Sequence, residues 1–177
     1  MAIDKYTQIS TKNGDKGISK NYSNEAFSKS DLLFETLGTI DELSSTLGLT
    51  FHYTHYEKIK NVQTTLQAIN ALIATNQTIH PKRYSALRQI NEKDIEFIED
   101  EETAFLEGKP IDPRFYLPGS ETTLKGAYFD VARAITRRAE RTLIRYIDTT
   151  KRDDLTYVQK YLNRLSDLFF ILARNFD

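Results

Sequence analysis

The sequence predicts an all-α fold, a bundle of about five helices that follows an irregular N-terminal arm of roughly thirty residues. Two observations support this prediction. The 7 Gly and 4 Pro gather in a few short segments, and between these segments apolar residues recur at the spacing of one helix face. Alternating patterns typical of strands are hard to find outside the first ten residues. The 177 residues suffice for a single domain, with the arm at residues 1–30 and the bundle at residues 31–177.

Breaks in the pattern separate the expected helices. A glycine-containing loop lies at residues 13–17, His80 and Pro81 interrupt the middle of the chain, and a long loop spans residues 108–120. Asp31 and Asp154 are expected at helix N-termini. The five apolar stripes are, in chain order, Leu33, Leu37, Ile40, Leu43 and Leu47; Ile59, Val62, Leu66, Ile69 and Ile73; Ile95, Ile98 and Phe105; Leu124, Val131, Ile135, Leu143 and Tyr146; and Leu155, Val158, Leu162, Leu165 and Leu172.

The composition excludes several functional classes. The chain holds 24 Lys and Arg against 25 Asp and Glu, and this lack of basic excess argues against nucleic-acid binding. The absence of Cys excludes disulfides, thiolate metal sites and a cysteine nucleophile. The N-terminus has no apolar segment of the signal-peptide kind, and no uncharged apolar run approaches membrane length. We therefore expect a cytoplasmic protein that binds neither nucleic acid nor membrane.

The arm is rich in groups that suit an anion. Glycine frees backbone N–H groups to turn toward an anion, hydroxyls add donors, and lysines supply positive charge. The residues of this kind are Thr11, Lys12, Asn13, Gly14, Ser19, Lys20 and Lys29. An arm of this length without secondary structure is unusual unless it has a function. A solvated Asn-Gly turn has the same composition and is the commoner case, so both interpretations stay open.

A run of arginines marks the fourth expected helix. Arg133, Arg137 and Arg141 are spaced so that they share one face, and Arg138 and Arg145 lie on its flank. Like charges at this spacing repel, so the stripe indicates a polyanionic ligand, a set of carboxylates or water. The carboxylates available for a salt-bridge network are those of Asp41, Glu42 and Glu140. Spacing alone does not choose between a ligand site and such a network.

Two further segments carry candidate groups. In the last expected helix Asn163, Arg164 and Asp167 lie close to the packed face, and a buried Asn or Arg needs partners from a ligand or from a neighbouring helix. The aromatic segment at residues 115–119 lies in the long loop. It could cap the core or form a flat apolar wall for a large planar ligand.

Five segments together resemble the PduO-type ATP:cob(I)alamin adenosyltransferases. They occur in the order and approximate spacing of that family, from about Tyr6 to the last residues. The segments are TKNGDKG at residues 11–17, GTIDELSS at 38–45, FYLPG at 115–119, ARAITRRAER at 132–141 and YLNRLSDLFF at 161–170.

The resemblance implies a fold and a reaction. Members of the family are five-helix bundles with ferritin-like up-down packing, and they assemble as trimers with each ATP between two subunits. The implied reaction transfers the 5′-deoxyadenosyl group of ATP to the cobalt of cob(I)alamin, with Mg²⁺, and a flavoprotein or other reductase supplies the reduced cobalamin. Cob(I)alamin is itself a strong nucleophile, so the protein needs no nucleophilic side chain.

The resemblance also assigns roles to residues of this chain. The nucleotide loop would contain Thr11, Lys12, Asn13, Gly14, Ser19, Lys20 and Lys29, and the bundle would complete the ATP site with Arg137, Arg138, Glu140, Arg141 and Asn163. Asp41 and Arg133 would form an ion pair between subunits. Phe115 would stand at the lower face of the corrin and displace the axial base. No residue is assigned as a metal ligand.

The chain also departs from the family pattern. Ser120 stands where the family has a second Gly after LPG, and Asp130 stands where a His is common. After residue 17 the chain lacks the family's small-hydroxyl pair and Gly-Gly turn. An alternative interpretation is therefore a weakly active or inactive helical bundle that binds a nucleotide or a corrinoid and acts as a sensor or carrier.

Overall fold

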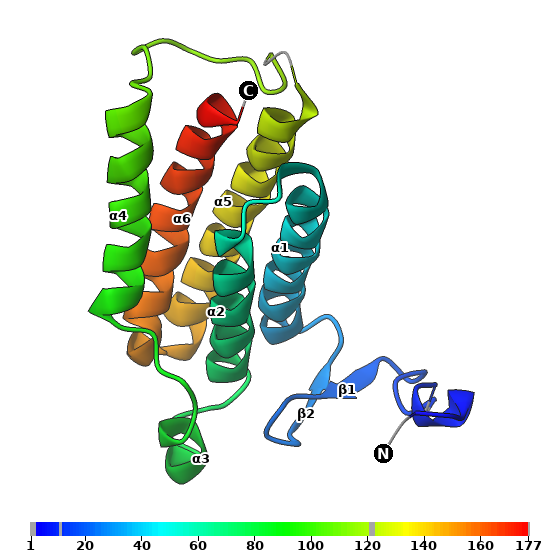
Figure 1. Cartoon of the computed structure of the whole chain (residues 1–177). Helices are drawn as coiled ribbons and strands as arrows, with labels where there is room; N and C mark the ends of the chain where they lie inside the picture. The colour runs from blue at the N-terminus through cyan, green and yellow to red at the C-terminus, as the bar shows by residue number, and fades with distance from the viewer. Residues whose placement is uncertain (1–2, 11, 121–122, 177) are drawn as a thin grey trace.

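Five long helices form an up-down bundle in the computed structural model, which describes residues 3–10, 12–120 and 123–176 (Figure 1). The expected all-α fold is thereby confirmed. The long helices are α1 (Leu32–Thr54), α2 (Lys58–Ile73), α4 (Glu92–Gly108), α5 (Leu124–Thr150) and α6 (Thr156–Asn175). Helix α5 packs against α1 and α6, α4 packs against α6, and α2 packs against α1. No helix in the described part of the chain is long and apolar enough to cross a membrane.

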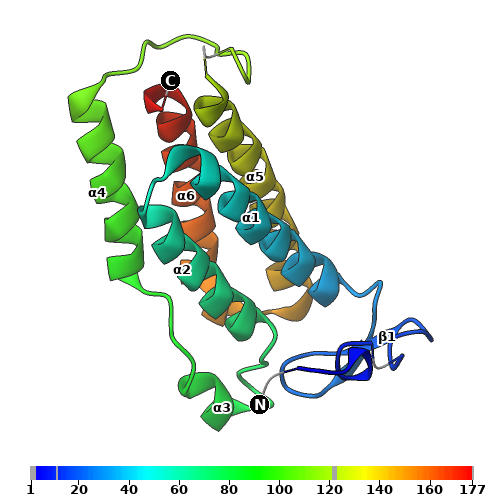
Figure 2. The ribbon, with the colours of Figure 1, turned by 45° about the vertical axis from the view of Figure 1, so that its right-hand side comes forward.

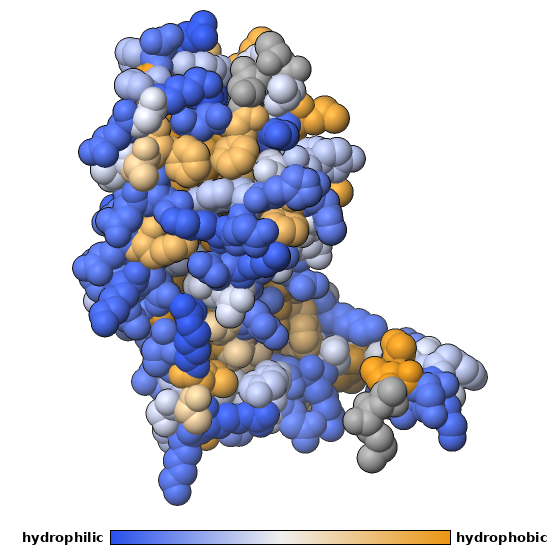
Figure 3. Space-filling model, in the orientation of Figure 1, coloured by the Kyte–Doolittle hydropathy of each residue, from blue (hydrophilic) through white to orange (hydrophobic). Residues whose placement is uncertain are grey.

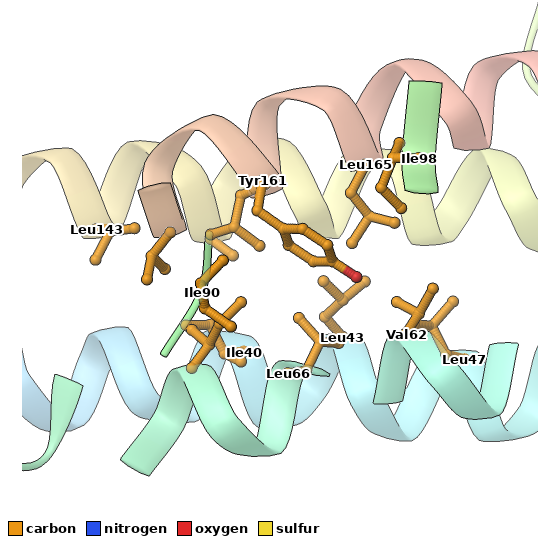
Figure 4. Packing of buried hydrophobic residues seen from close by; sticks show 14 of the residues in the cluster. Ile40, Leu43, Leu47, Val62, Leu66, Ile90, Ile98, Leu143, Tyr161 and Leu165 are labelled. Carbon is orange, nitrogen blue, oxygen red and sulfur yellow. The ribbon is translucent and has the colours of Figure 1, made fainter. Parts of the chain in front are cut away.

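The core lies between the long helices. Figure 4 shows Ile40 and Leu43 of α1 facing Leu66 of α2, with Tyr161 and Leu165 of α6 above them. Each of these side chains is buried, and burial of an aliphatic side chain contributes about 1.5–3 kcal/mol. The stripes expected on four of the five helices therefore face the core largely as predicted.

The stripe expected on α5 is wrong at its first two positions. Leu124 is 64% exposed and Val131 is 51% exposed. The face that contacts α1 and α6 instead carries small side chains, including Ala132, Thr136 and Ala139, all of which are fully buried. These small residues allow the three helices to approach closely, and Phe129 and Leu143 fill the same buried face. Leu124 and Val131 lie off this face and are therefore on the outer surface.

The arm is more regular than expected. It contains a 3₁₀ turn at Tyr6–Gln8 and an antiparallel hairpin of β1 (Ile18–Lys20) and β2 (Ala26–Ser28). The Phe27 ring meets Phe34 of α1 edge to face at 6.5 Å, which ties the hairpin to the bundle. The expectation of a wholly irregular arm is therefore wrong, because cross-strand pairing satisfies its backbone.

Short elements complete the chain. Helix α3 (Pro81–Ser85), which was not expected, follows the break at His80, and a 3₁₀ turn at Asp153–Leu155 precedes α6. Asp31 caps α1 as expected, since its carboxylate accepts a hydrogen bond from the Leu33 N–H at 2.8 Å. The arm leaves the bundle at the end where α1 begins, and the loop between α4 and α5 crosses the opposite end (Figures 1 and 2).

Candidate functional site

The glycine-containing segment of the arm folds around Lys29. A Cβ atom at Gly14 would lie 2.6 Å from the Lys29 Nζ, so the absence of a side chain lets the ammonium rest against the loop. The Lys29 N–H donates to the Gly17 carbonyl at 2.8 Å, and the Gly17 N–H donates to the Gly14 carbonyl at 3.2 Å. Gly17 (φ 75°) and Lys12 (φ 60°) adopt left-handed backbone conformations. The loop therefore brings Lys29 beside the segment predicted to bind an anion.

The other predicted arm residues surround this loop. Asn13 and Lys12 are exposed, and the predicted residue Thr11 lies outside the described residues. Ser19 and Lys20 follow each other in β1, so their side chains point to opposite faces of the hairpin. Lys20 lines a cavity of about 720 Å³ between the hairpin, α1 and α2. Figure 3 shows the arm standing away from the bundle at the lower right.

The arginine stripe of α5 divides into paired and unpaired members. Arg138 forms an ion pair with Glu42, and Arg145 lies 3.6 Å from a carboxylate oxygen of Glu35. These flanking arginines thus form the salt-bridge network that was one of the two interpretations. Arg137 and Arg141 are exposed, and within the described residues neither has an ion-pair partner. Those two guanidinium groups remain available to an anion.

Asn163 belongs to a hydrogen-bonded chain that joins three helices. Its amide Nδ2 donates to Glu140 Oε1 at 3.1 Å, and its Oδ1 accepts from Arg164 at 3.0 Å. The Arg164 guanidinium in turn donates to Glu99 of α4 at 2.9 Å. These side chains line a cavity of about 400 Å³. Because Arg164 occupies the amide oxygen, Asn163 presents its N–H side toward α5.

Acidic groups around Arg164 perturb a nearby carboxyl. Burial, together with the charges of Asp167 and Glu99, raises the pKa of Glu102 to about 7, while the charge of Arg164 opposes this shift. This carboxyl therefore changes charge near neutral pH. In the described part of the chain, however, no three Asp, Glu, His or Cys side chains are grouped so as to hold a metal ion.

Asp41 and Arg133 do not meet within the chain. The ion pairs of Glu42 with Arg138 and of Glu35 with Arg145 set the register of α1 against α5. In this register Arg133 lies about six residues along the helix axis from the level of Asp41, or about 9 Å at 1.5 Å per residue. Asp41 lines the cavity beside the arm. Arg133 instead lies over the Phe170 ring, at 5.4 Å from its centroid.

Phe115 lies at the far end of the bundle from the arm. It belongs to the loop between α4 and α5, which crosses that end of the bundle (Figure 1). Its side chain is fully exposed, at 106%. It lines an apolar cavity of about 430 Å³ together with Phe170 and Leu106. One chain therefore holds Lys29 and Phe115 at opposite ends, with Arg137 between them on the outer face of α5.

Sequence reasoning missed two groups near Phe115. Phe170, which contacts Arg133, was hidden in the apolar run of the last helix. Arg174 is buried beside Asp130, and the only signal for it was a charged residue at the end of the core stripe. The roles of both residues depend on contacts between the loop and the end of α6, which exist only in the folded chain.

The fold and these sites describe a helical bundle with cationic side chains on its arm and outer face and an aromatic pocket at one end. The family model for cobalamin adenosyltransferases matches residues 9–176. The chain therefore belongs to the cobalamin adenosyltransferase family, and the predicted resemblance to its PduO type is confirmed.

Individual relatives agree with this assignment. The chain is 33% identical to the corrinoid adenosyltransferase MMAB of Bos taurus, over 96% of this chain and 71% of that protein. It is 32% identical to the corrinoid adenosyltransferase of Citrobacter freundii, over 94% of this chain and 93% of that protein. A solved variant of the PduO-type ATP:corrinoid adenosyltransferase from Lactobacillus reuteri, complexed with cobalamin and ATP, has a TM-score of 0.82 and 28% identity, covering 94% of this chain and 92% of that chain.

Proposed function

We propose that this chain transfers the 5′-deoxyadenosyl group of ATP to the cobalt of cob(I)alamin, producing adenosylcobalamin and triphosphate. In this reaction an electron pair of Co(I) attacks C5′ and forms the cobalt–carbon bond, which formally oxidises cobalt to Co(III). The C5′–O bond breaks, and triphosphate leaves with the bonding electrons. The protein then has to align the two substrates and stabilise the charge of the leaving group. The observation that carries the proposal is the pair of exposed guanidinium groups, Arg137 and Arg141, on the helix whose Glu140 binds the Asn163 amide.

The roles proposed for the nucleotide side follow from these groups. Residues 1–30 form the nucleotide-binding arm and residues 31–177 the bundle that receives it. The arm residues proposed to wrap the triphosphate are Thr11, Lys12, Asn13, Gly14, Ser19, Lys20 and Lys29. The bundle residues proposed to complete the ATP site are Arg137, Arg138, Glu140, Arg141 and Asn163. Arg138 already pairs with Glu42, so its contact with ATP would require sharing or exchanging that partner.

The proposed assembly is a homotrimer whose active sites are shared between subunits. The arm and the loop between α4 and α5, which carries Phe115, lie at opposite ends of one chain (Figure 1). A single subunit therefore does not bring both to one pair of substrates. The offset between Asp41 and Arg133 along the helices likewise favours a pair formed between two copies. The outer surface of α1 and α5 exposes Leu49, Tyr53 and Val131, which would be covered in a closed ring with one repeated interface.

The corrinoid side of the proposal rests on Phe115. A fully exposed aromatic ring beside an apolar cavity suits the lower face of a large flat ring, where it fills space without coordinating cobalt. Mg²⁺ is proposed to enter with ATP as part of the substrate. The phosphates themselves supply ligands to Mg²⁺, which usually needs only one or two carboxylates in addition. A reductase that delivers cob(I)alamin and a cytoplasmic place of action complete the proposal.

The direct test incubates the protein with Mg-ATP and chemically reduced cobalamin and follows the absorption spectrum. Appearance of adenosylcobalamin at a rate that depends on enzyme concentration is the expected result. A sensor or carrier would bind both substrates without forming the cobalt–carbon bond. Binding without turnover would therefore replace the proposed reaction with that alternative.

The shared site has its own test by subunit mixing. Lys29→Ala and Arg137→Ala are each expected to abolish most activity, since each removes one half of every site. Coexpressed in equal amounts, they should restore about a quarter of wild-type activity, because one site in four combines two intact halves in a ring with a repeated interface. Lys12→Ala coexpressed with Lys29→Ala is the matched control and should restore nothing, because both changes affect the same half. Failure of the first mixture to recover activity would contradict a shared site.

A further inference from the structure

A buried ion pair joins α5 to the end of α6 beneath the Phe115 loop. The Arg174 Nη1 lies 2.9 Å from Asp130 Oδ1, and the Nη2 lies 3.4 Å from Oδ2. The two side chains are only 6% and 5% exposed.

The loop is attached to this pair at three points. The Gly119 N–H donates to Asp130 Oδ2 at 3.2 Å, and the Tyr116 ring centroid lies 4.8 Å from the Arg174 guanidinium. The Lys109 ammonium donates to the Arg174 backbone carbonyl at 2.8 Å. Residues at the start, the middle and the end of the loop thus contact the same two residues of the bundle.

Arg174 also connects the loop to the corrinoid side of the helix bundle. Its guanidinium lies 4.8 Å from the Phe170 centroid, on a ring that Arg133 approaches at 5.4 Å. Tyr116, Arg174, Phe170 and Arg133 therefore form a continuous series of ring and guanidinium contacts. A shift of Arg174 would therefore change its contact with Tyr116 in the loop and, through the Phe170 ring, the position of Arg133.

Phe115 depends on these contacts for its position. Its own side chain is fully exposed and buries no surface that would hold it in one place, whereas its neighbour Tyr116 is partly buried and contacts Arg174. A buried ion pair is seldom retained for stability, because an apolar pair of similar volume is often as stable. Its directional hydrogen bonds do, however, specify one geometry.

We propose that the Asp130–Arg174 pair is a positioning device that holds the loop of residues 109–120, and with it Phe115, in register with Arg133 for corrinoid binding. This inference rests on the proposed function, because it assigns the loop to the corrinoid side of the site. Neither Asp130 nor Arg174 touches the reacting atoms in this account. They act through Tyr116, Gly119 and Phe170.

The test compares Arg174→Lys with Arg152→Lys. Arg152 is as buried as Arg174 and pairs with Asp154, at 5% and 13% exposure. It lies at the opposite end of the bundle and also donates to the Leu72 carbonyl at 3.0 Å. Both variants keep the charge and lose the fork of the guanidinium. Any general cost of weakening a buried ion pair is therefore common to both. Tyr116→Leu serves as a second variant, which removes the ring contact and leaves the ion pair intact.

Two measurements are made at temperatures where each variant is folded. The first is kcat/KM for cobalamin and for cobinamide, which lacks the axial base, together with the Kd of ATP. Arg174→Lys and Tyr116→Leu should lower kcat/KM for cobalamin at least about tenfold, and less for cobinamide, while the Kd of ATP changes less than about twofold. Arg152→Lys should leave the cobalamin-to-cobinamide ratio unchanged.

The second measurement is the rate of tryptic cleavage after Arg114, identified by mass spectrometry, which reports loop release without any need for activity. Cleavage should accelerate at least about fivefold in Arg174→Lys and stay at the wild-type rate in Arg152→Lys. A released loop with an unchanged ratio of corrinoid efficiencies would overturn the positioning role, as would equal behaviour of Arg174→Lys and Arg152→Lys. An inactive wild-type protein would refute the proposed reaction, whereas the cleavage rates would still decide whether the pair anchors the loop.

Discussion

Arg137→Lys separates a ligand-binding arginine from a structural one. Arg137 is exposed and has no ion-pair partner among the described residues, so the substitution should change the free energy of unfolding by less than about 0.5 kcal/mol. For a chain of this length that corresponds to less than about 2 °C in Tm. A guanidinium can bind phosphate oxygens through two parallel hydrogen bonds, whereas an ammonium cannot reproduce that geometry. Loss of the fork should lower kcat/KM for ATP at least about tenfold, or about 1.4 kcal/mol.

The assay for Arg137→Lys measures initial rates of adenosylcobalamin formation with saturating cob(I)alamin and varied Mg-ATP, alongside thermal melting. Arg145→Lys is the matched control, because Arg145 lies on the same helix, is 65% exposed and pairs with Glu35 rather than with the proposed ligand. Its kcat/KM should stay within about twofold of wild type. If Arg137→Lys instead melts lower while its kcat/KM is unchanged, the arginine serves the fold and the nucleotide assignment is incorrect.

Three further predictions address other parts of the site. Phe115→Ala should lower kcat/KM for cobalamin at least about tenfold and kcat/KM for cobinamide much less. It should leave Tm unchanged, because the ring is fully exposed. Equal losses on both corrinoids would count against displacement of the axial base. Asn163→Ala should weaken ATP binding in calorimetric titration, and an unchanged Kd would remove Asn163 from the nucleotide site. The substitution should also lower Tm by a few degrees, because it removes the hydrogen bonds to Glu140 and from Arg164. Each of these bonds contributes about 0.5–1.5 kcal/mol. Glu102→Gln should stabilise the protein at pH 8 more than at pH 5. The pKa of Glu102 is raised from 4.5 to about 7, so the folded state binds the proton more tightly and wild-type stability falls as the pH rises between these values. Glu107→Gln, an exposed change on the same helix, should show no such trend in melting curves, and a parallel trend in both variants would contradict the explanation.

The buried positions of the helices show which features the local sequence predicts and which depend on packing between helices. The first stripe was predicted correctly because periodicity and breaking residues are properties of neighbouring positions, and Leu33, Ile40 and Leu47 are buried as expected. The N-cap at Asp31 is equally local. On α5, by contrast, Leu124 and Val131 have the apolar character of core residues and yet face outward, because α1 and α6 pack against the face that carries Phe129, Ala132 and Leu143.

The arginine stripe illustrates the same limit for the site. Arg137 and Arg138 are adjacent and chemically identical, and no local pattern says which of them is free. Arg138 is paired because Glu42, 96 positions away in the sequence, lies beside it after folding. Arg137 is exposed and has no ion-pair partner among the described residues.

The sequence by itself determined that this chain is a helical bundle, where its cationic and aromatic side chains stand along the chain, and which family it resembles. The tertiary structure alone decided that the arm pairs into a hairpin, that Lys29 and Phe115 lie at opposite ends of the bundle, and that Asp130 meets Arg174 beneath the loop. The physical reason is that helix propensity and periodicity act over a few neighbouring residues. Ion pairs, hydrogen bonds and buried contacts between distant segments exist only once the chain has packed.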